Sequence, residues 1–151
     1  MPKQILNAEL QNELQVSCSY EVMPNGETRT RMSFPNGSAY ILTSREDCAN
    51  GSWQNSHYHK SVLETYIVQE GKVAFARIVK GLLAIRIFYF GDVFTTQIGE
   101  HHNLYLFEGS IIHTVKHGKS LEKDWFESPE LDTLTKKLSP QEILAFAGEC
   151  Y

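Results

Sequence analysis

The middle of the chain is a series of short apolar runs in which β-branched and aromatic residues dominate. A glycine follows each run, namely Gly71, Gly81, Gly91 and Gly99, so a turn recurs about every 8–10 residues. This spacing is typical of an antiparallel β-sandwich or β-barrel, in which tight turns join short strands. The predicted strands cover residues 64–70, 72–79, 82–90 and 92–98.

The segments on either side of this centre carry the same strand signals. The tripeptide Pro-Asn-Gly, a strong turn signal, occurs at residues 24–26 and again at residues 35–37. We expect the β-structure to extend from about residue 20 to about residue 120. Further segments of strand-like composition lie at residues 28–34, 38–44, 102–108 and 110–118.

Both ends of the chain change to helical patterns. Apolar residues recur at near-helical spacing over about residues 5–16, which predicts a short helix there. Near the other end, Ser128 and Ser139 each precede a proline, the pattern of an N-cap followed by the first helical residue. Glu142 stands three residues after Ser139 and completes a capping box. The sequence thus predicts an all-β fold with short terminal helices, the C-terminal ones within about residues 128–150.

Length and charge limit the possible classes of protein. A chain of 151 residues is the size of one domain, and we treat residues 1–151 as a single domain. Its net charge is −4, and the 14 Lys and Arg residues are too scattered to bind nucleic acid or an anionic membrane. The longest apolar stretch, residues 81–91, contains Arg86 and is too short to span a bilayer. We therefore expect neither nucleic acid nor a membrane as a partner.

The cysteines and the N-terminal residues bear on the compartment. Cys18, Cys48 and Cys150 are far apart and odd in number, which is neither a disulfide framework nor the spacing of a zinc site. Reduced thiols are the simplest interpretation. Residues 1–15 lack the basic region and apolar block of a signal peptide. We therefore expect a cytoplasmic protein.

Residues 51–71 hold the densest group of potential metal ligands. His57 and His59 are two positions apart, so a strand would place both imidazoles on the same face. Glu64 lies an odd number of residues after His59, so one continuous strand would place its side chain on the opposite face. A turn through residues 60–63 removes this conflict and would let Glu64 begin the next strand. Two neutral imidazoles and a carboxylate suit a divalent first-row metal such as Zn, Mn, Fe, Ni or Co.

A further ligand should come from a strand that is not adjacent in the sequence. In our expected register, His102 shares a strand face with Leu104 and Leu106. If those leucines point into the interior, His102 points inward too, and His101 becomes an exposed surface histidine. His113 is the substitute ligand if this register is wrong.

These spacings resemble the first sequence motif of the cupin superfamily, G-x5-H-x-H-x3,4-E-x6-G. The second cupin motif, G-x5-P-x-G-x2-H-x3-N, is matched less completely, because Gln97 replaces the usual proline and Leu106 the usual asparagine. The residues that match the first motif are Gly51, His57, His59, Glu64 and Gly71, and those that match the second are Gly91, Gly99 and His102.

The resemblance implies a cupin-type antiparallel β-barrel or jelly roll that carries one metal site. The ion would be a single divalent metal, with Fe, Mn, Ni and Zn as the candidates. The resemblance implies that its ligands are His57, His59, Glu64 and His102.

A site of this kind implies a metal-dependent enzyme that acts on a small oxygen-rich metabolite. Three imidazoles and one carboxylate leave open positions on a six-coordinate ion, where a small-molecule substrate can bind through its oxygens. Within cupins this chemistry includes dioxygenases, decarboxylases, and isomerases or epimerases of sugars. A non-catalytic small-molecule-binding or regulatory cupin is the first alternative. A metal-free, epimerase-like cupin that uses a histidine base is the second.

Three residues are candidates for a catalytic role. Glu64 is one of them, and Tyr66 is another because it shares a strand face with Glu64. His113 is the third, as an acid or base. Arg77 and Arg86 are most simply outward-pointing and solvated, although an inward arginine would indicate an anionic substrate.

The resemblance also implies a homodimer, because many cupins pair their barrels through an edge strand or a terminal segment. The apolar residues Ile5, Leu6 and Leu10 could provide the contact surface. The C-terminal helix around Leu144 and Phe146 is the other candidate. Packing of both segments on the ends of the barrel is the alternative to a dimer.

Overall fold

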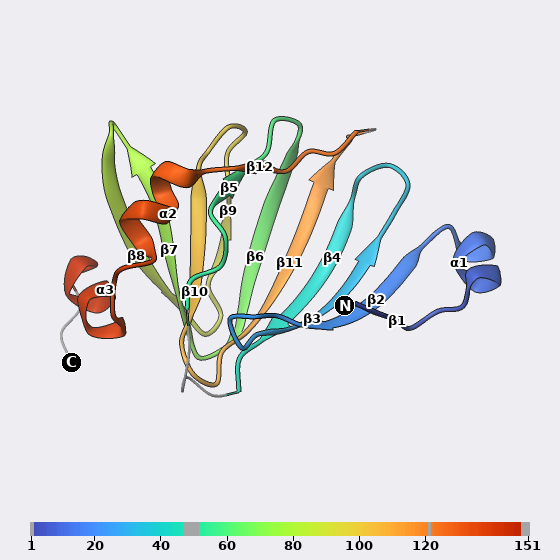
Figure 1. Cartoon of the computed structure of the whole chain (residues 1–151), viewed down its shortest axis with the longest axis horizontal. Helices are drawn as coiled ribbons and strands as arrows, with labels where there is room; N and C mark the ends of the chain where they lie inside the picture. Colours follow the sequence, from blue (N-terminus) through green and yellow to red (C-terminus); the bar gives the residue numbers. More distant parts are fainter. Residues whose placement is uncertain (1, 47–51, 121, 149–151) are drawn as a thin grey trace.

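Two antiparallel β-sheets face each other in this protein and enclose an apolar core (Figure 1). A computed structural model describes residues 2–46, 52–120 and 122–148. Three residues discussed above, Cys48, Gly51 and Cys150, lie outside the described residues.

The larger sheet has seven strands in the order β1-β2-β3-β4-β11-β6-β9, and neighbouring strands pair antiparallel. The late strand β11 is inserted between β4 and β6, so distant segments of the chain become neighbours. The strands are β1 Lys3–Gln4, β2 Ser17–Val22, β3 Thr28–Ser33, β4 Ala39–Ser44, β6 Val62–Glu70, β9 Val93–Thr95 and β11 Ile111–Gly118.

The smaller sheet has five strands in the order β12-β5-β10-β7-β8, again antiparallel throughout. Its two shortest strands, β5 and β12, each contain two residues. The strands are β5 His57–Tyr58, β7 Lys72–Val79, β8 Leu82–Tyr89, β10 His102–Leu106 and β12 Phe126–Glu127.

Side chains that alternate along the strands fill the space between the sheets, as the period-two pattern predicts. In β7, Val73 and Phe75 belong to this inner core, whereas Ala74 and Ala76 point to the other face of the sheet. The inner core consists of Tyr66, Val68, Val73, Phe75, Phe88, Leu104, Leu106 and Ile112.

Two C-terminal helices, α2 (Pro129–Thr135) and α3 (Pro140–Phe146), cover the outer face of the smaller sheet (Figure 1). Leu131 and Ile143 are fully buried there. The predicted capping box is confirmed, because Ser139 and Glu142 bond reciprocally to each other's backbone N–H. β7 and β10 are therefore buried on both faces.

The N-terminal helix α1 (Ala8–Leu14) is shorter than the predicted 5–16 segment and lies at the end of the molecule remote from α2 and α3 (Figure 1). Asn7 caps it by accepting a hydrogen bond from the backbone N–H of Leu10. No residue of α1 is buried.

The predicted all-β fold with terminal helices is confirmed, and a jelly-roll sandwich fits the strand arrangement. Of the two forms that we expected, the jelly roll is the one that fits, and no described strand of one sheet pairs with a strand of the other to close a barrel. No helix among the described residues is long and apolar enough to cross a membrane. The division of the chain into a single domain stays a prediction.

The motif glycine Gly71 gives a test of the fold. It has a left-handed backbone (φ 70°), and an added Cβ would lie 2.5 Å from Oγ of the buried Ser110. Gly81 is also left-handed (φ 78°) but has open space around it. We expect Gly81→Ala to cost about 1–2 kcal/mol of unfolding free energy, and Gly71→Ala to cost roughly 1–3 kcal/mol more. Urea denaturation measures both, and equal losses would contradict the packing at Ser110.

Candidate metal centre

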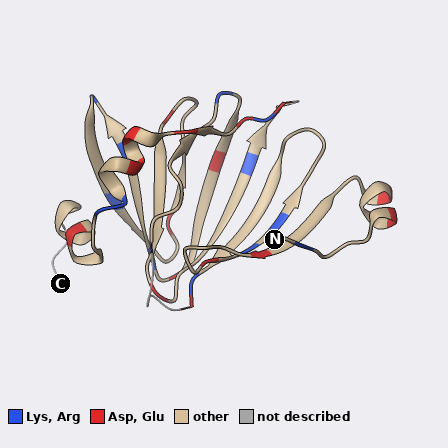
Figure 2. Ribbon diagram, in the orientation of Figure 1, with Lys and Arg blue, Asp and Glu red and all other residues tan. Residues whose placement is uncertain are grey.

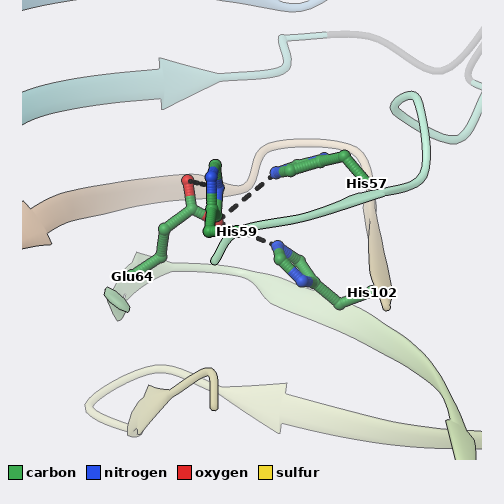
Figure 3. A group of neighbouring side chains, drawn as sticks. All are labelled: His57, His59, Glu64 and His102. Carbon is green, nitrogen blue, oxygen red and sulfur yellow. Dashed lines mark hydrogen bonds and ion pairs between the residues drawn. The ribbon is translucent and has the colours of Figure 1, made fainter. Parts of the chain in front are cut away.

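Four potential metal ligands come together where the two sheets approach each other (Figure 3). His57 in β5 lies directly opposite His102 in β10 in the smaller sheet, and His59 follows β5. Glu64 comes from β6 of the larger sheet. One ligand atom from each residue lies within 4.8 Å of the others, and all four side chains are nearly or fully buried. The predicted residues therefore form a possible metal site.

Each of the three imidazoles is oriented by a hydrogen bond at its Nδ1. The partner is a backbone carbonyl in every case, and a carbonyl can only accept, so Nδ1 carries the proton. The Nε2 atom of each neutral ring is then left with a free lone pair, as in metal-binding histidines. The pairs are His57 with Asn55 at 2.9 Å, His102 with Glu100 at 2.8 Å, and His59 with Asp124.

The three Nε2 atoms converge on the carboxylate of Glu64. Their distances to its oxygens are 3.5 Å from His57, 3.3 Å from His59 and 2.9 Å from His102. Nε2 of His57 and of His59 are buried without a hydrogen-bond partner among the described residues. A lone pair and a carboxylate oxygen do not bond to each other, so a proton or a cation must lie between them. The donor set and its burial fit a divalent metal ion.

Positive and hydrogen-bonding groups surround the Glu64 carboxyl. The Tyr66 hydroxyl donates to it at 2.5 Å, and the Lys116 ammonium lies 3.4 Å away. Burial would raise the pKa of this carboxyl, but hydrogen bonds from the facing imidazole nitrogens when they carry a proton, together with the Lys116 ammonium, hold that pKa well below its usual range. Burial, and next the charge of Glu64, raise the pKa of Tyr66, whereas burial lowers the pKa of His57. The site thus favours an ionised carboxylate, a protonated phenol and a neutral His57.

Asp124, which sequence reasoning missed, fixes the turn before Glu64. Its carboxylate accepts the backbone N–H groups of Lys60, Ser61 and Val62 at 2.7, 2.9 and 2.9 Å. Its backbone carbonyl is the acceptor for His59 Nδ1. The next residue, Trp125, stacks on the His57 ring, with 5.4 Å between the two ring centroids. No local signal could have indicated a contact across more than 60 residues.

The structure does not bring His113 to this group. In β11 its neighbour Thr114 pairs with Tyr66, which faces the site, so His113 points to the opposite face of the sheet. There its ring nitrogens interact with Tyr40 and Gln69. Of the two alternatives for the fourth ligand, the structure therefore brings His102 into the group.

The other residues considered above lie outside the group of four. His101 is half-buried rather than exposed, because it stacks on Tyr58 and its Nδ1 interacts with the Ser128 hydroxyl at 2.7 Å. That hydroxyl is consequently not used to cap α2. Arg77 and Arg86 are both exposed.

The chain was compared with known proteins. No protein-family model matches it, and no curated protein matches it either. Among solved structures, oxalate decarboxylase from Bacillus subtilis matches with a TM-score of 0.57 and 18% identity, over 85% of this chain and 34% of that one. Oxalate oxidase in complex with the substrate analogue glycolate matches with a TM-score of 0.55 and 17% identity, over 71% and 57%. KdgF from Halomonas sp. matches with a TM-score of 0.54 and 16% identity, over 67% and 86%.

These neighbours are all cupin proteins, so this chain has the fold that the two motifs indicate. It spans about a third of the length of the oxalate decarboxylase chain. That enzyme has Mn(II) centres. At such low identity the likeness concerns the fold, and the four converging residues provide the independent indication of a metal site.

Two matched substitutions test which histidine completes the site. His102→Ala removes an Nε2 that lies 2.9 Å from Glu64 and should lower metal affinity by at least about 10–100-fold. His113→Ala removes a histidine on the opposite sheet face and should leave the metal content unchanged. Plasma mass spectrometry of both variants after reconstitution measures the metal per chain. Full metal content in His102→Ala, or its loss in His113→Ala, would contradict the ligand assignment.

Proposed function

We propose that this protein is a metal-dependent enzyme that acts on a small oxygen-rich metabolite. In this proposal, one divalent ion is held by His57, His59, Glu64 and His102. The observation that carries it is the convergence of three Nε2 lone pairs and one carboxylate in a buried group. The backbone carbonyls that fix each Nδ1 support it, because they prepare the rings to bind a metal before any ion arrives.

The reaction class follows from what such an ion supplies. When bound, a divalent metal with open positions polarises a substrate oxygen, acidifies a water or activates dioxygen. Dioxygenase, decarboxylase and sugar isomerase or epimerase chemistry are the candidate classes. The names of two neighbours, an oxalate decarboxylase and an oxalate oxidase, support decarboxylation and dioxygen-dependent oxidation over sugar isomerisation.

Tyr66 is the residue that we assign to proton transfer. Its side chain is buried but lines a small cavity, and its hydroxyl donates to Glu64 and lies 3.5 Å from Nε2 of His102. Its raised pKa keeps the phenol protonated at neutral pH, so it can donate a proton to a substrate oxygen at the metal. Glu64 orients that hydroxyl and accepts its hydrogen bond.

Metal removal and a conservative substitution test this function together. Protein treated with a chelator should lose turnover on a panel of hydroxy acids, dicarboxylates and sugars, and reloading should restore it. Tyr66→Phe should keep the metal but lower turnover by about 100-fold, whereas Tyr40→Phe, beside His113 on the other sheet face, should not. Turnover that survives metal removal would contradict the proposal. Metal-loaded protein without turnover would favour a binding module.

A homodimer through the N-terminal segment belongs to the same proposal. Ile5, Leu10 and Leu14 are 52%, 40% and 56% exposed, and α1 buries none of its residues. A seven-residue helix that buries none of its residues is marginally stable in water, so a second copy would supply further contacts. Leu144 of α3 is buried in the core and is therefore not free to form the alternative surface, whereas Phe146 is exposed. A cytoplasmic location stays a prediction.

Light scattering tests the dimer. The wild-type protein should have twice the 17.2 kDa mass of the chain, and Leu10→Glu with Leu14→Glu should reduce it to one chain. Phe146→Glu, a charge on an equally exposed residue of α3, is the control and should leave the mass unchanged. A monomeric wild-type protein would contradict the proposal.

A further inference from the structure

Two cavities with shared lining residues lie beside the candidate metal site. The one that we call the outer chamber has a volume of about 490 Å³, and the one that we call the inner chamber has a volume of about 80 Å³. The inner chamber reaches the side chains of Glu64, Tyr66 and Lys116. The residues that line both chambers are Arg29, Arg31, Gln54, His57 and Trp125.

Positive charge gathers along these cavities. Figure 2 shows basic positions on β3 and β11, with an acidic position on β6 beside β11. The inner chamber is lined by three cations, Arg29, Arg31 and Lys116, and by one carboxylate, Glu64. Metal binding would make this surplus larger.

The three cations differ in how far they are already neutralised. Arg29 donates to the buried carboxylate of Glu27 at 2.9 Å, and Lys116 lies 3.4 Å from Glu64. The guanidinium of Arg31 forms no hydrogen bond or ion pair with any described residue. Arg31 is half-buried, and the carboxylates of Glu64 and Glu21 act on it only through charge at longer range. An anion bound directly to this partly desolvated guanidinium would therefore be favourable.

The strand register directs Arg31 toward the metal ligands. Arg31 pairs with the buried Ile41, Ile41 with Thr114, and Thr114 with Tyr66. These residues form one row on the inner face, and three strand spacings separate the backbones of Arg31 and Tyr66 by roughly 14 Å. The side chains of Arg31, Tyr66 and Glu64 all line the inner chamber, so a short molecule bound there can contact both the guanidinium and the metal ligands.

We propose that the substrate is a small carboxylic acid, bound with its carboxylate on Arg31 and with an oxygen at the candidate metal site. This inference rests on the proposed function and narrows its substrate class. The planar fork of one free guanidinium matches one carboxylate with two parallel hydrogen bonds. The flat indole of Trp125 forms one wall, and the inner volume of 80 Å³ excludes a bulky group. A neutral sugar would leave Arg31 without an anion.

Calorimetric titration of metal-loaded protein with lactate and with 1,2-propanediol tests the carboxylate directly, because the two differ only in that group. Lactate should bind and the diol should not. Arg31→Gln should weaken lactate binding by at least about tenfold while keeping the wild-type metal content. Arg86→Gln, the same change at an exposed arginine that lines neither chamber, is the matched control and should bind lactate as the wild type does.

Several results would overturn this inference. Equal lactate affinity in wild type and Arg31→Gln would mean that the metal alone binds the acid, and the proposed metal function would still stand. If the diol binds as tightly as lactate, the ligand of Arg31 need not be an anion. If inorganic phosphate binds more tightly than lactate, the preferred anion is not a carboxylate. If the protein takes up no metal, the proposed function fails, and the same titrations of the metal-free protein decide the role of Arg31 separately.

Discussion

The structure depends on one electrostatic constraint, the close approach of three imidazole lone pairs to a buried carboxylate. Backbone carbonyls hold the Nδ1 protons of His57, His59 and His102, so their Nε2 atoms cannot also donate while the rings are neutral. Four acceptors within 4.8 Å of one another in a buried space repel unless a cation lies among them. A divalent ion satisfies all four at once, whereas a proton satisfies only one pair.

The sandwich places this constraint between its two sheets. His57 and His102 belong to the smaller sheet and Glu64 to the larger one, so a bound ion would connect the two layers. The same inner surface continues through β11 and β4 to β3, where Arg31 lies in one row with Tyr66. The candidate metal ligand Glu64 and the proposed anion-binding residue Arg31 therefore lie on one continuous inner surface.

Local features of this site could be predicted from the sequence, and long-range ones could not. The spacing of His57, His59 and Glu64 and the reciprocal cap of α3 are short-range patterns with a direct physical reading. Asp124 and Arg31 join the site only because distant strands meet, and nothing near them in the sequence indicates that partner. His101 shows the same limit, since its contact with Ser128 depends on where α2 packs.

Anomalous diffraction from crystals of the Mn- or Zn-loaded protein tests the central claim most directly. The account predicts one strong peak per chain, bonded to Nε2 of each histidine and to a carboxylate oxygen of Glu64. A peak at other residues would contradict it. So would a reconstituted protein without a peak, in which Nε2 of His57 and of His59 each form a hydrogen bond instead.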